Sequence, residues 1–317
     1  MRILVFGLGA LGTVYACLLK NAGHFVVGID REPVVSRVKT QGLGITGIWG
    51  EHTAFLDEVA STVDEVQARS FDLIVLTVKS FDTAEAASKL VGLAGAGTYV
   101  VLAQNGYGNY EAASAFLPPE QLIVARVIFG SETLEPGKAK VTVIADDVVI
   151  GSPQNLISEE VLAEIAEQFS TCGIPTRASN EVMKYVWGKI IYNSALNSLG
   201  AILEVPYGKL AENKYTAGLM DAMIDEIFAV LEASGETTLW ADAGAYRQAF
   251  YGQMVPSTAQ HHASMLQDIQ RGRKTEIDAL NGAVVELGMK LGIDTPVNRV
   301  IVSLVKAKEE LSRQRVE

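Results

Sequence analysis

The sequence predicts an α/β protein with a doubly wound parallel sheet domain followed by an all-helical C-terminal domain. Up to about residue 178, short and nearly continuous apolar runs alternate with helical stretches. This alternation is typical of a parallel sheet with helices on both faces. Beyond Ser179 the strands stop and apolar residues recur at helical spacing. A G-x-G-x-x-G motif between the first strand and the first helix is the third observation, and we place the division between residues 179 and 180.

Five apolar runs predict strands of a sheet that is covered on both faces: Ile3–Phe6, Phe25–Ile29, Leu73–Val78, Tyr99–Ala103 and Leu122–Ile128. The helices predicted in this half are Ala10–Lys20, Thr83–Leu90, Tyr110–Phe116 and Glu159–Phe169, with a short extended piece at Pro175–Arg177. Two further runs, Lys140–Ile144 and Val148–Gly151, flank Asp146-Asp147. They predict a hairpin that adds antiparallel strands at one edge.

The second half predicts helices only, at Glu181–Leu203, Lys209–Ala233, Ser257–Gln270, Glu276–Leu291 and Pro296–Leu311. Proline and glycine residues lie between these segments and mark their ends. No repeat of 20–50 residues is visible, which argues against a solenoid.

The composition excludes several classes of protein. The 317 residues carry a formal net charge of −11, so we expect no binding to nucleic acid or to an anionic membrane. The two cysteines, Cys17 and Cys172, are too few for a disulfide framework or a Cys-rich metal site, and we predict no metal. The apolar stretch after Arg2 has the outline of a signal peptide, but three glycines interrupt it. No other apolar run reaches about 18 residues, which predicts a cytoplasmic protein.

The most specific short motif is Gly7-Leu8-Gly9-Ala10-Leu11-Gly12. Gly7 permits the tight turn, Gly9 lets the backbone approach a pyrophosphate, and Gly12 lets the helix pack closely on the strand. The unpaired amides at the start of the helix then hold the diphosphate, which explains how an acidic protein binds an anion. We therefore predict that residues 1–179 form a Rossmann-type dinucleotide-binding domain.

Two charged residues follow the second strand and bear on the choice of cofactor. Asp30 favours the free ribose hydroxyls of NAD, whereas Arg31 can meet the 2′-phosphate of NADP. The alternative for Arg31 is a solvated loop position. The residues alone do not decide whether the cofactor is NAD or NADP.

A polar stripe marks the first helix of the second half. Lys189, Asn193 and Asn197 are spaced at i, i+4 and i+8, so they share one face of a helix that is otherwise rich in apolar residues. This pattern favours a helix along a cleft, which makes residues 180–317 the substrate and catalytic domain. The alternative is a partly exposed helix whose lysine reaches solvent.

A second polar stretch runs from Ser264 to Asp278. Thr275 and Asp278 fit a capping box, which is a structural interpretation. The alternative is that Glu276 faces the lysine of the stripe. A carboxylate there keeps an ammonium group protonated and oriented, as a proton donor to a carbonyl oxygen requires.

Two further polar positions follow predicted strands of the first half. Lys79 follows Leu73–Val78, and Gln104-Asn105-Gly106 follows Tyr99–Ala103. Ligands of open α/β sheets bind outside the carboxyl ends of the strands, so we expect both positions at the cofactor site. The alternatives are a charge beside a helix and a turn former.

Taken together, these segments resemble the 2-dehydropantoate 2-reductase (ketopantoate reductase) family. Five segments match in order and spacing over nearly the whole chain: the glycine loop, Val78-Lys79, Gln104-Asn105-Gly106-Tyr107-Gly108, the Lys189/Asn193/Asn197 stripe, and Ser264–Asp268 with Gly272–Asp278. Five matches are far more specific than the glycine loop alone.

The resemblance implies the NADPH-dependent reduction of 2-dehydropantoate to (R)-pantoate, a step towards pantothenate and coenzyme A. It makes Lys189 the proton donor to the new hydroxyl, with Glu276 close to both cofactor and lysine. It assigns substrate binding to Lys189, Asn193, Asn197 and Ser264, and cofactor binding to Gly7, Leu8, Gly9, Ala10, Leu11, Gly12, Arg31, Lys79, Asn105 and Glu276. Arg31 meets the 2′-phosphate in this scheme.

Other functions stay open at this point. The chain has Tyr207 and His261 where the family pattern has Asn, so a reductase of another branched or aromatic 2-keto acid, using NADH, is one alternative. A β-hydroxyacid or polyol-phosphate dehydrogenase is another. A regulatory protein that senses NAD(P) without turnover is the third, but the joint presence of the polar stripe, Ser264 and Glu276 argues against it. The helical half is compatible with a homodimer.

Overall fold

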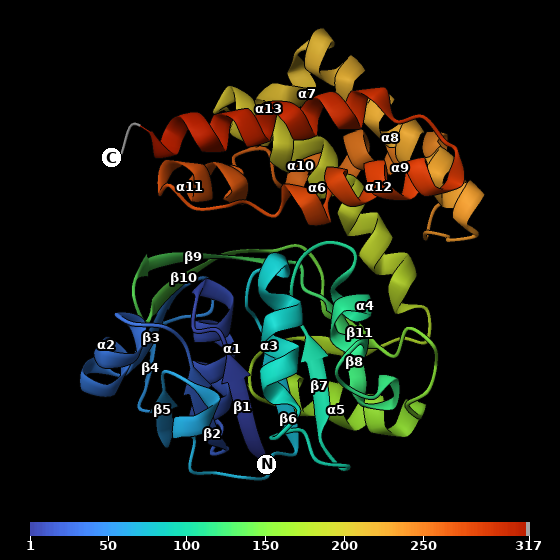
Figure 1. The fold of residues 1–317 in the computed structure, drawn as a ribbon. Coiled ribbons are helices and arrows are strands. Elements are labelled where there is room, and N and C mark those ends of the chain that lie inside the picture. Colours follow the sequence, from blue (N-terminus) through green and yellow to red (C-terminus); the bar gives the residue numbers. More distant parts are fainter. Residues whose placement is uncertain (315–317) are drawn as a thin grey trace. The chain divides into compact units, whose positions relative to one another are not determined.

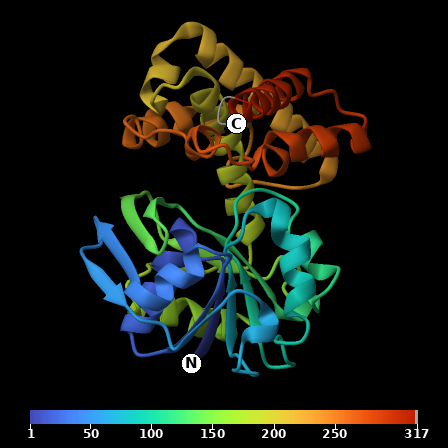
Figure 2. The ribbon, with the colours of Figure 1, turned by 60° about the vertical axis from the view of Figure 1, so that its left-hand side comes forward.

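The computed structural model describes residues 1–314, and their contacts form two compact units. Unit 1 comprises Met1–Gln104 and Asn109–Val182, and unit 2 comprises Asn105–Gly108 and the chain from Met183 onwards. Unit 1 contains the sheets and their helices, whereas unit 2 is built of helices (Figures 1 and 2). The four residues 105–108 therefore belong to the helical unit, although the sequence of unit 1 continues on both sides of them.

The main sheet of unit 1 has eight strands. In spatial order they are β12 (Thr176–Ala178), β11 (Val148–Gly151), β8 (Leu122–Arg126), β7 (Tyr99–Leu102), β6 (Leu73–Leu76), β1 (Arg2–Phe6), β2 (Phe25–Ile29) and β5 (Glu58–Ala60). Every neighbouring pair is parallel except β8 with β11. The chain order reverses between β1 and β6, which makes their carboxyl ends the expected ligand site. The predicted doubly wound sheet is confirmed.

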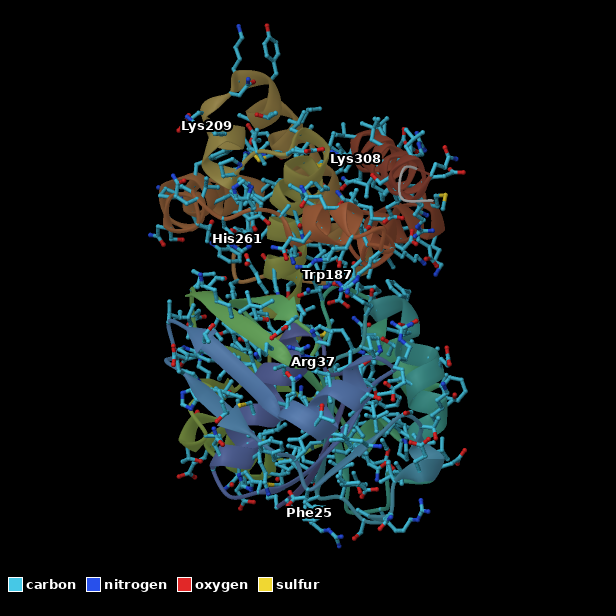
Figure 3. The ribbon with its side chains drawn as sticks, turned by 90° about the vertical axis from the view of Figure 1, so that its left-hand side faces the viewer. Phe25, Arg37, Trp187, Lys209, His261 and Lys308 are labelled. Carbon is cyan, nitrogen blue, oxygen red and sulfur yellow. The ribbon has the colours of Figure 1, made fainter. Side chains whose placement is uncertain are left out.

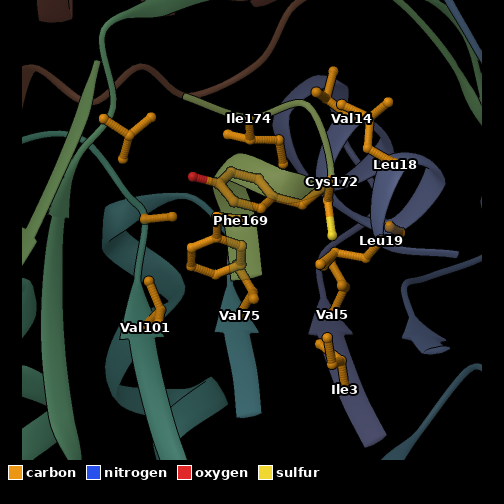
Figure 4. Packing of buried hydrophobic residues seen from close by; sticks show 14 of the residues in the cluster. Ile3, Val5, Val14, Leu18, Leu19, Val75, Val101, Phe169, Cys172 and Ile174 are labelled. Atoms are coloured by element: carbon orange, nitrogen blue, oxygen red, sulfur yellow. The ribbon is translucent and has the colours of Figure 1, made fainter. Parts of the chain in front are cut away.

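Helices cover both faces of this sheet (Figure 1). Ile3 and Val5 belong to a core with α1 (Ala10–Asn21) and α5 (Glu159–Thr171), and Figure 4 shows this packing around Phe169. Leu4 points to the opposite core, beneath α3 (Thr83–Leu90) and α4 (Asn109–Ser114). Because both faces are buried, the central strands need apolar residues at successive positions, which explains their continuous apolar pattern. The remaining helical elements of unit 1 are α2 (Val34–Gln41), η1 (Val63–Glu65), η2 (Ser80–Asp82) and η3 (Pro119–Gln121).

A second, smaller sheet of unit 1 was not predicted. Its strands, in spatial order, are β4 (His52–Ala54), β3 (Leu43–Gly47), β10 (Lys138–Ile144) and β9 (Phe129–Glu135). It packs against α1, where the Tyr15 ring meets Phe129 of β9 at 6.2 Å and Phe169 of α5 at 5.3 Å between centroids. The first helix is thus enclosed by two sheets.

The hairpin predicted from 140–144 and 148–151 is wrong. Both runs are strands, but β10 pairs with β9 and β3, whereas β11 pairs with β8 and β12 in the main sheet. The actual hairpin turns at Pro136-Gly137, where Gly137 has a φ of +75°. Asp146 lies at a bend between β10 and β11, and its carboxylate accepts a hydrogen bond from the buried Arg126 of β8 at 2.7 Å.

Unit 2 consists of α6 (Val182–Leu203), α7 (Tyr207–Glu212), α8 (Lys214–Ser234), α9 (Ala243–Ala249), the π-helix η4 (Phe250–Met254), α10 (Val255–Ser257), α11 (Ser264–Gln270), η5 (Ile277–Ala279), α12 (Asn281–Leu291) and α13 (Pro296–Arg313). None of the helices within residues 1–314 has the length and apolar character needed to cross a bilayer.

Three helix predictions in this unit need correction. The segment 209–233 is two helices, because Asn213 caps α8 by accepting from the amides of Tyr215 and Thr216. The helix predicted from Ser257 starts only at Ser264, since the carbonyls of Ala259 and His261 accept from the first amides of α7. Helix α12 starts at Asn281 rather than 276.

Helix α6 carries the predicted polar stripe and is fixed along its length. In its first half, a Cβ at Gly188 would lie 2.7 Å from the Trp240 ring, so glycine allows this ring to pack closely on the helix. At its end, the Lys308 ammonium donates to the carbonyls of Ala201 and Ile202 at 2.7 and 2.9 Å (Figure 3). These carbonyls have no partner within the helix, so Lys308 acts as its C-terminal cap.

Candidate functional site

The glycine loop of unit 1 has the geometry that its sequence predicts. A Cβ on Gly12 would lie 1.7 Å from the Gly7 carbonyl oxygen, so only glycine lets α1 start this close to β1. Gly7 has a φ of +99°. A Cβ on Gly9, by contrast, would meet no atom within 4 Å. The fold therefore requires Gly7 and Gly12, whereas the space at Gly9 is open.

The start of α1 offers hydrogen-bond donors beside that space. Gly9 is the N-cap, and the first amide bonded within the helix is that of Thr13, which donates to the Gly9 carbonyl at 2.9 Å. The amides of Ala10, Leu11 and Gly12 precede it and have no helical acceptor by geometry. Donors at a helix N-terminus, with open space at Gly9, fit the diphosphate of a dinucleotide.

Thr77 holds the glycine loop and was missed at the sequence level. Its hydroxyl lies 2.6 Å from the Gly7 carbonyl oxygen and 3.1 Å from that of Phe6, and its amide donates to Phe6 at 2.9 Å. Thr77 is the first residue after β6. A hydroxyl residue inside the apolar run 73–78 is the signal that could have found this position.

Asp30 and Arg31 follow β2, which ends at Ile29. The Asp30 carboxylate accepts from the Leu8 amide at 2.5 Å and from the Arg31 amide at 2.6 Å. Asp30 thus ties the glycine loop to the end of β2. The Arg31 side chain is exposed, and its charge helps to lower the pKa of Glu85, for which the neighbouring Lys89 is the main cause.

Lys79 lies three residues beyond Leu76, the last residue of β6, which pairs with Phe6 of β1. It is half-buried and precedes η2. Lys79, the glycine loop and Arg31 therefore all follow the carboxyl ends of three adjacent parallel strands.

A polar cluster in unit 2 joins three of the predicted site residues. The Lys189 ammonium donates to Oδ1 of Asn105 at 2.6 Å, and Nδ2 of Asn105 lies 3.4 Å from a carboxylate oxygen of Glu276. An ammonium group can only donate and a carboxylate only accept, which fixes the orientation of the amide between them. The sequence offers Glu276 facing the lysine as one of two interpretations, and it does not indicate that Asn105 links the two.

The capping box considered at Thr275 and Asp278 is not present. Thr275 Oγ1 accepts from the Ile277 amide at 3.3 Å, and the segment forms the single 3₁₀ turn η5 instead of a helix start. Asp278 lies 2.6 Å from the Lys306 ammonium. This turn leaves Glu276 at its N-terminal end, where its side chain meets Asn105.

The rest of the stripe on α6 is buried. Asn193 and Asn197 are 9% and 6% exposed. Asn197 donates to the hydroxyl of Ser264 at 3.1 Å and accepts from the Met265 amide at 3.1 Å, so it anchors the start of α11. Ser264 itself is exposed. The structure thus brings Asn197 of α6 together with Ser264 of α11. Asn197 lies on the same face of α6 as Lys189.

Tyr192 is another proton-bearing side chain on α6, three residues after Lys189. Its hydroxyl lies 2.6 Å from that of Thr258, and burial raises its pKa to about 12. Tyr192 therefore holds its proton more tightly than an ordinary tyrosine does.

Tyr207 and His261 lie in the aromatic part of unit 2. The Tyr207 ring is 5.3 Å from the His261 ring and 6.0 Å from Tyr192, and only 2% of Tyr207 is exposed. A Cβ on Gly200 would meet the Tyr207 ring at 3.3 Å, which places this ring one turn beyond Asn197 on α6. The Tyr207 ring thus lies close to the helix that carries the predicted polar stripe, and His261 packs against that ring.

Within residues 1–314, no group of three or more His, Cys, Asp and Glu side chains is arranged to hold a metal ion. Cys17 and Cys172 are buried thiols, and burial raises the pKa of both. Neither thiol is activated as a nucleophile.

Comparisons with known proteins cover almost the whole chain. The family model described as Ketopantoate reductase PanE/ApbA matches residues 3–155, and its C-terminal counterpart matches residues 181–309. The 2-dehydropantoate 2-reductase of Aquifex aeolicus (strain VF5) is 46% identical over 98% of this chain and 97% of its own length.

Solved structures agree with these matches. The PanE/ApbA family ketopantoate reductase from Ralstonia eutropha JMP134 superimposes with a TM-score of 0.86 at 30% identity, covering 99% of this chain and all of its own. A D-mandelate dehydrogenase solved with NADH and anilino(oxo)acetate superimposes with a TM-score of 0.89 at 24% identity, covering 98% and 99%. At that identity the likeness shows the fold alone.

Proposed function

This chain belongs to the ketopantoate reductase family, and on that premise we propose that it reduces 2-dehydropantoate to (R)-pantoate with NADPH, on the route to pantothenate and coenzyme A. The observation that carries the proposal is the cluster of Lys189, Asn105 and Glu276 within one unit. An oriented ammonium group is what the reduction of a keto group needs, since negative charge develops on the carbonyl oxygen.

The roles of the chain's residues follow from their chemistry. NADPH, when bound, supplies the hydride. Lys189 donates a proton from Nζ to the oxygen of the keto group as it becomes a hydroxyl. Asn105 accepts a hydrogen bond from Nζ, which favours the charged form of the lysine, and Glu276 acts through the other end of the same amide. Asn193, Asn197 and Ser264 bind the keto acid, with the two asparagines offering buried amides on the face of Lys189.

Most of the proposed cofactor residues lie in unit 1, whereas Asn105 and Glu276 belong to unit 2. Gly7, Leu8, Gly9, Ala10, Leu11 and Gly12 hold the diphosphate, with Lys79, Asn105 and Glu276 as further contacts. NADPH is the proposed cofactor because both oxygens of Asp30 already accept backbone amides, whereas the guanidinium of Arg31 is exposed. We place the reaction in the cytoplasm.

Steady-state kinetics with NADPH and NADH against 2-dehydropantoate, 2-ketoisovalerate and an aromatic 2-keto acid test this function. The highest kcat/KM is expected for NADPH with 2-dehydropantoate. Arg31→Ala is expected to raise KM for NADPH and to leave KM for NADH unchanged. A preference for the aromatic acid with NADH would replace the proposed substrate, and cofactor binding without turnover of any keto acid would favour a sensor.

We also propose a homodimer formed through α13. Val300, Leu304 and Leu311 are 56%, 47% and 58% exposed and share one face of this helix. Arg299 and Glu310 flank that face on one side, so an antiparallel second copy pairs each arginine with the other copy's glutamate. Light scattering is expected to give twice the chain mass of 34.0 kDa, and Leu304→Glu to give a monomer. A monomeric parent protein excludes this interface.

A further inference from the structure

We propose that Asn105–Gly108 is a clasp built into the helical unit, and that Tyr107 is a positioning residue for the proton donor Lys189. This inference rests on the proposed function, because it concerns the same ammonium group. The chain leaves unit 1 after Gln104, contributes these four residues to unit 2 and returns at Asn109. Asn105, which accepts the hydrogen bond of Lys189, is therefore held by unit 2 itself.

The backbone of the clasp is docked on the turn that carries Glu276. The Tyr107 amide donates to the Ala279 carbonyl at 2.8 Å. Gly106 has a φ of +89°, and a Cβ on it would lie 2.4 Å from that same carbonyl oxygen. Gly106 therefore permits a close approach that any side chain would block. This contact fixes Asn105 and Glu276 with respect to each other, as their hydrogen bond requires.

The side chain of the clasp is docked on the helix that carries Lys189. The Tyr107 ring stacks on the Trp187 ring, with 5.0 Å between centroids and 30° between planes. Trp187 is fully buried and precedes Lys189 by two residues on α6. An aromatic pair of this kind contributes about 0.5–1.5 kcal/mol beyond the area it buries.

The three contacts act together on one group. Tyr107 is bound to α6 through its ring and to η5 through its backbone, so Asn105 two residues earlier lies between Lys189 and Glu276. An acceptor held against the ammonium raises the pKa of the lysine, because it stabilises the charged form. Loosening the clasp is expected to lower that pKa without removing any group that touches the substrate.

The test compares Tyr107→Ala with Tyr107→Phe, which keeps the ring, and with Tyr215→Ala on α8, a tyrosine that is 73% exposed. Tyr107→Ala is expected to lower kcat about tenfold. It is also expected to shift the alkaline limb of the kcat–pH profile to lower pH, by about half a pH unit or more. Tyr107→Phe should restore both values, and Tyr215→Ala should match the parent. Thermal unfolding is measured for each variant.

Other outcomes overturn the inference. A parent-like kcat and alkaline limb in Tyr107→Ala excludes a positioning role, and a lower kcat with an unmoved limb reduces Tyr107 to general packing. If Tyr107→Ala does not fold, Tyr107→Leu, which fills the space without stacking, is expected to move the limb in the same direction, and an unmoved limb there contradicts the clasp. Failure of the parent protein to reduce any 2-keto acid defeats the proposed function instead, and is distinguished from these results by the parent assay.

Discussion

Replacing Lys189 with alanine is expected to lower kcat for 2-dehydropantoate by about 10²–10⁴-fold, the usual contribution of a positioned general acid. The methyl group of alanine has no proton to donate to the new hydroxyl, and Tyr192, one turn further along α6, holds its proton more tightly than an ordinary tyrosine, since burial raises its pKa to about 12. Affinity for NADPH should change little, because the diphosphate donors lie in unit 1. Stopped-flow or steady-state kinetics, with a separate binding titration for NADPH, measures the two effects.

The matched control is Lys209→Ala. Lys209 is an exposed lysine of the same unit whose ammonium pairs with Glu212 on the surface (Figure 3). Its loss is expected to leave kcat and KM at parent values. Parent-like kcat in Lys189→Ala would remove this lysine from the mechanism, and equal losses in both variants would indicate a non-specific effect of removing positive charge.

Gly12→Ala is expected to abolish NADPH binding and to destabilise unit 1. The added methyl carbon would lie 1.7 Å from the Gly7 carbonyl oxygen and 2.6 Å from the Thr77 hydroxyl, so α1 or the glycine loop must move. Overpacking at such a site typically costs about 1–3 kcal/mol. Thermal unfolding and an NADPH titration measure both consequences.

Gly9→Ala is expected to distinguish an effect on cofactor binding from an effect on the stability of the fold. A methyl group there meets nothing within 4 Å, and the φ of −65° suits alanine, so the unfolding temperature should match the parent. NADPH affinity should still fall, because the space at Gly9 is the one proposed for the diphosphate. Unchanged affinity in Gly9→Ala would mean that the cofactor phosphates lie elsewhere, whatever Gly12→Ala shows.

The main sheet could be predicted because strands that are buried on both faces have a recognisable sequence pattern. Strands such as Ile3–Phe6 need apolar side chains at every position, and that pattern is visible without a structure. The strands of the second sheet do not all show such a pattern. Strand β9, with the sequence FGSETLE, is mostly half-buried and shows neither a continuous nor an alternating pattern. Because β9 is not recognisable from the sequence, the predicted hairpin joins β10 to the nearest apolar run, 148–151. That run is β11, which belongs to the main sheet.

The site divides in the same way. Lys189, Asn193 and Asn197 were visible because one helix fixes their spacing, and the glycine loop because its three glycines have separate steric tasks. The link through Asn105 depends on two segments that are 84 residues apart in sequence, and no local pattern encodes such a distance. Thr77 is similar, since its hydroxyl acts on a carbonyl 70 residues earlier in the chain.

The excursion of residues 105–108 into the helical unit has a consequence for recombining this protein with its relatives. A chimera that takes its C-terminal half from another reductase, joined near residue 182, receives a foreign surface beneath its own Asn105–Gly108. Gly106 and Tyr107 must then dock on a different turn and a different aromatic ring. The residues proposed to donate and orient the proton are therefore encoded in two separate parts of the gene. A crossover that keeps them together has to exchange codons 105–108 along with those of the helical half.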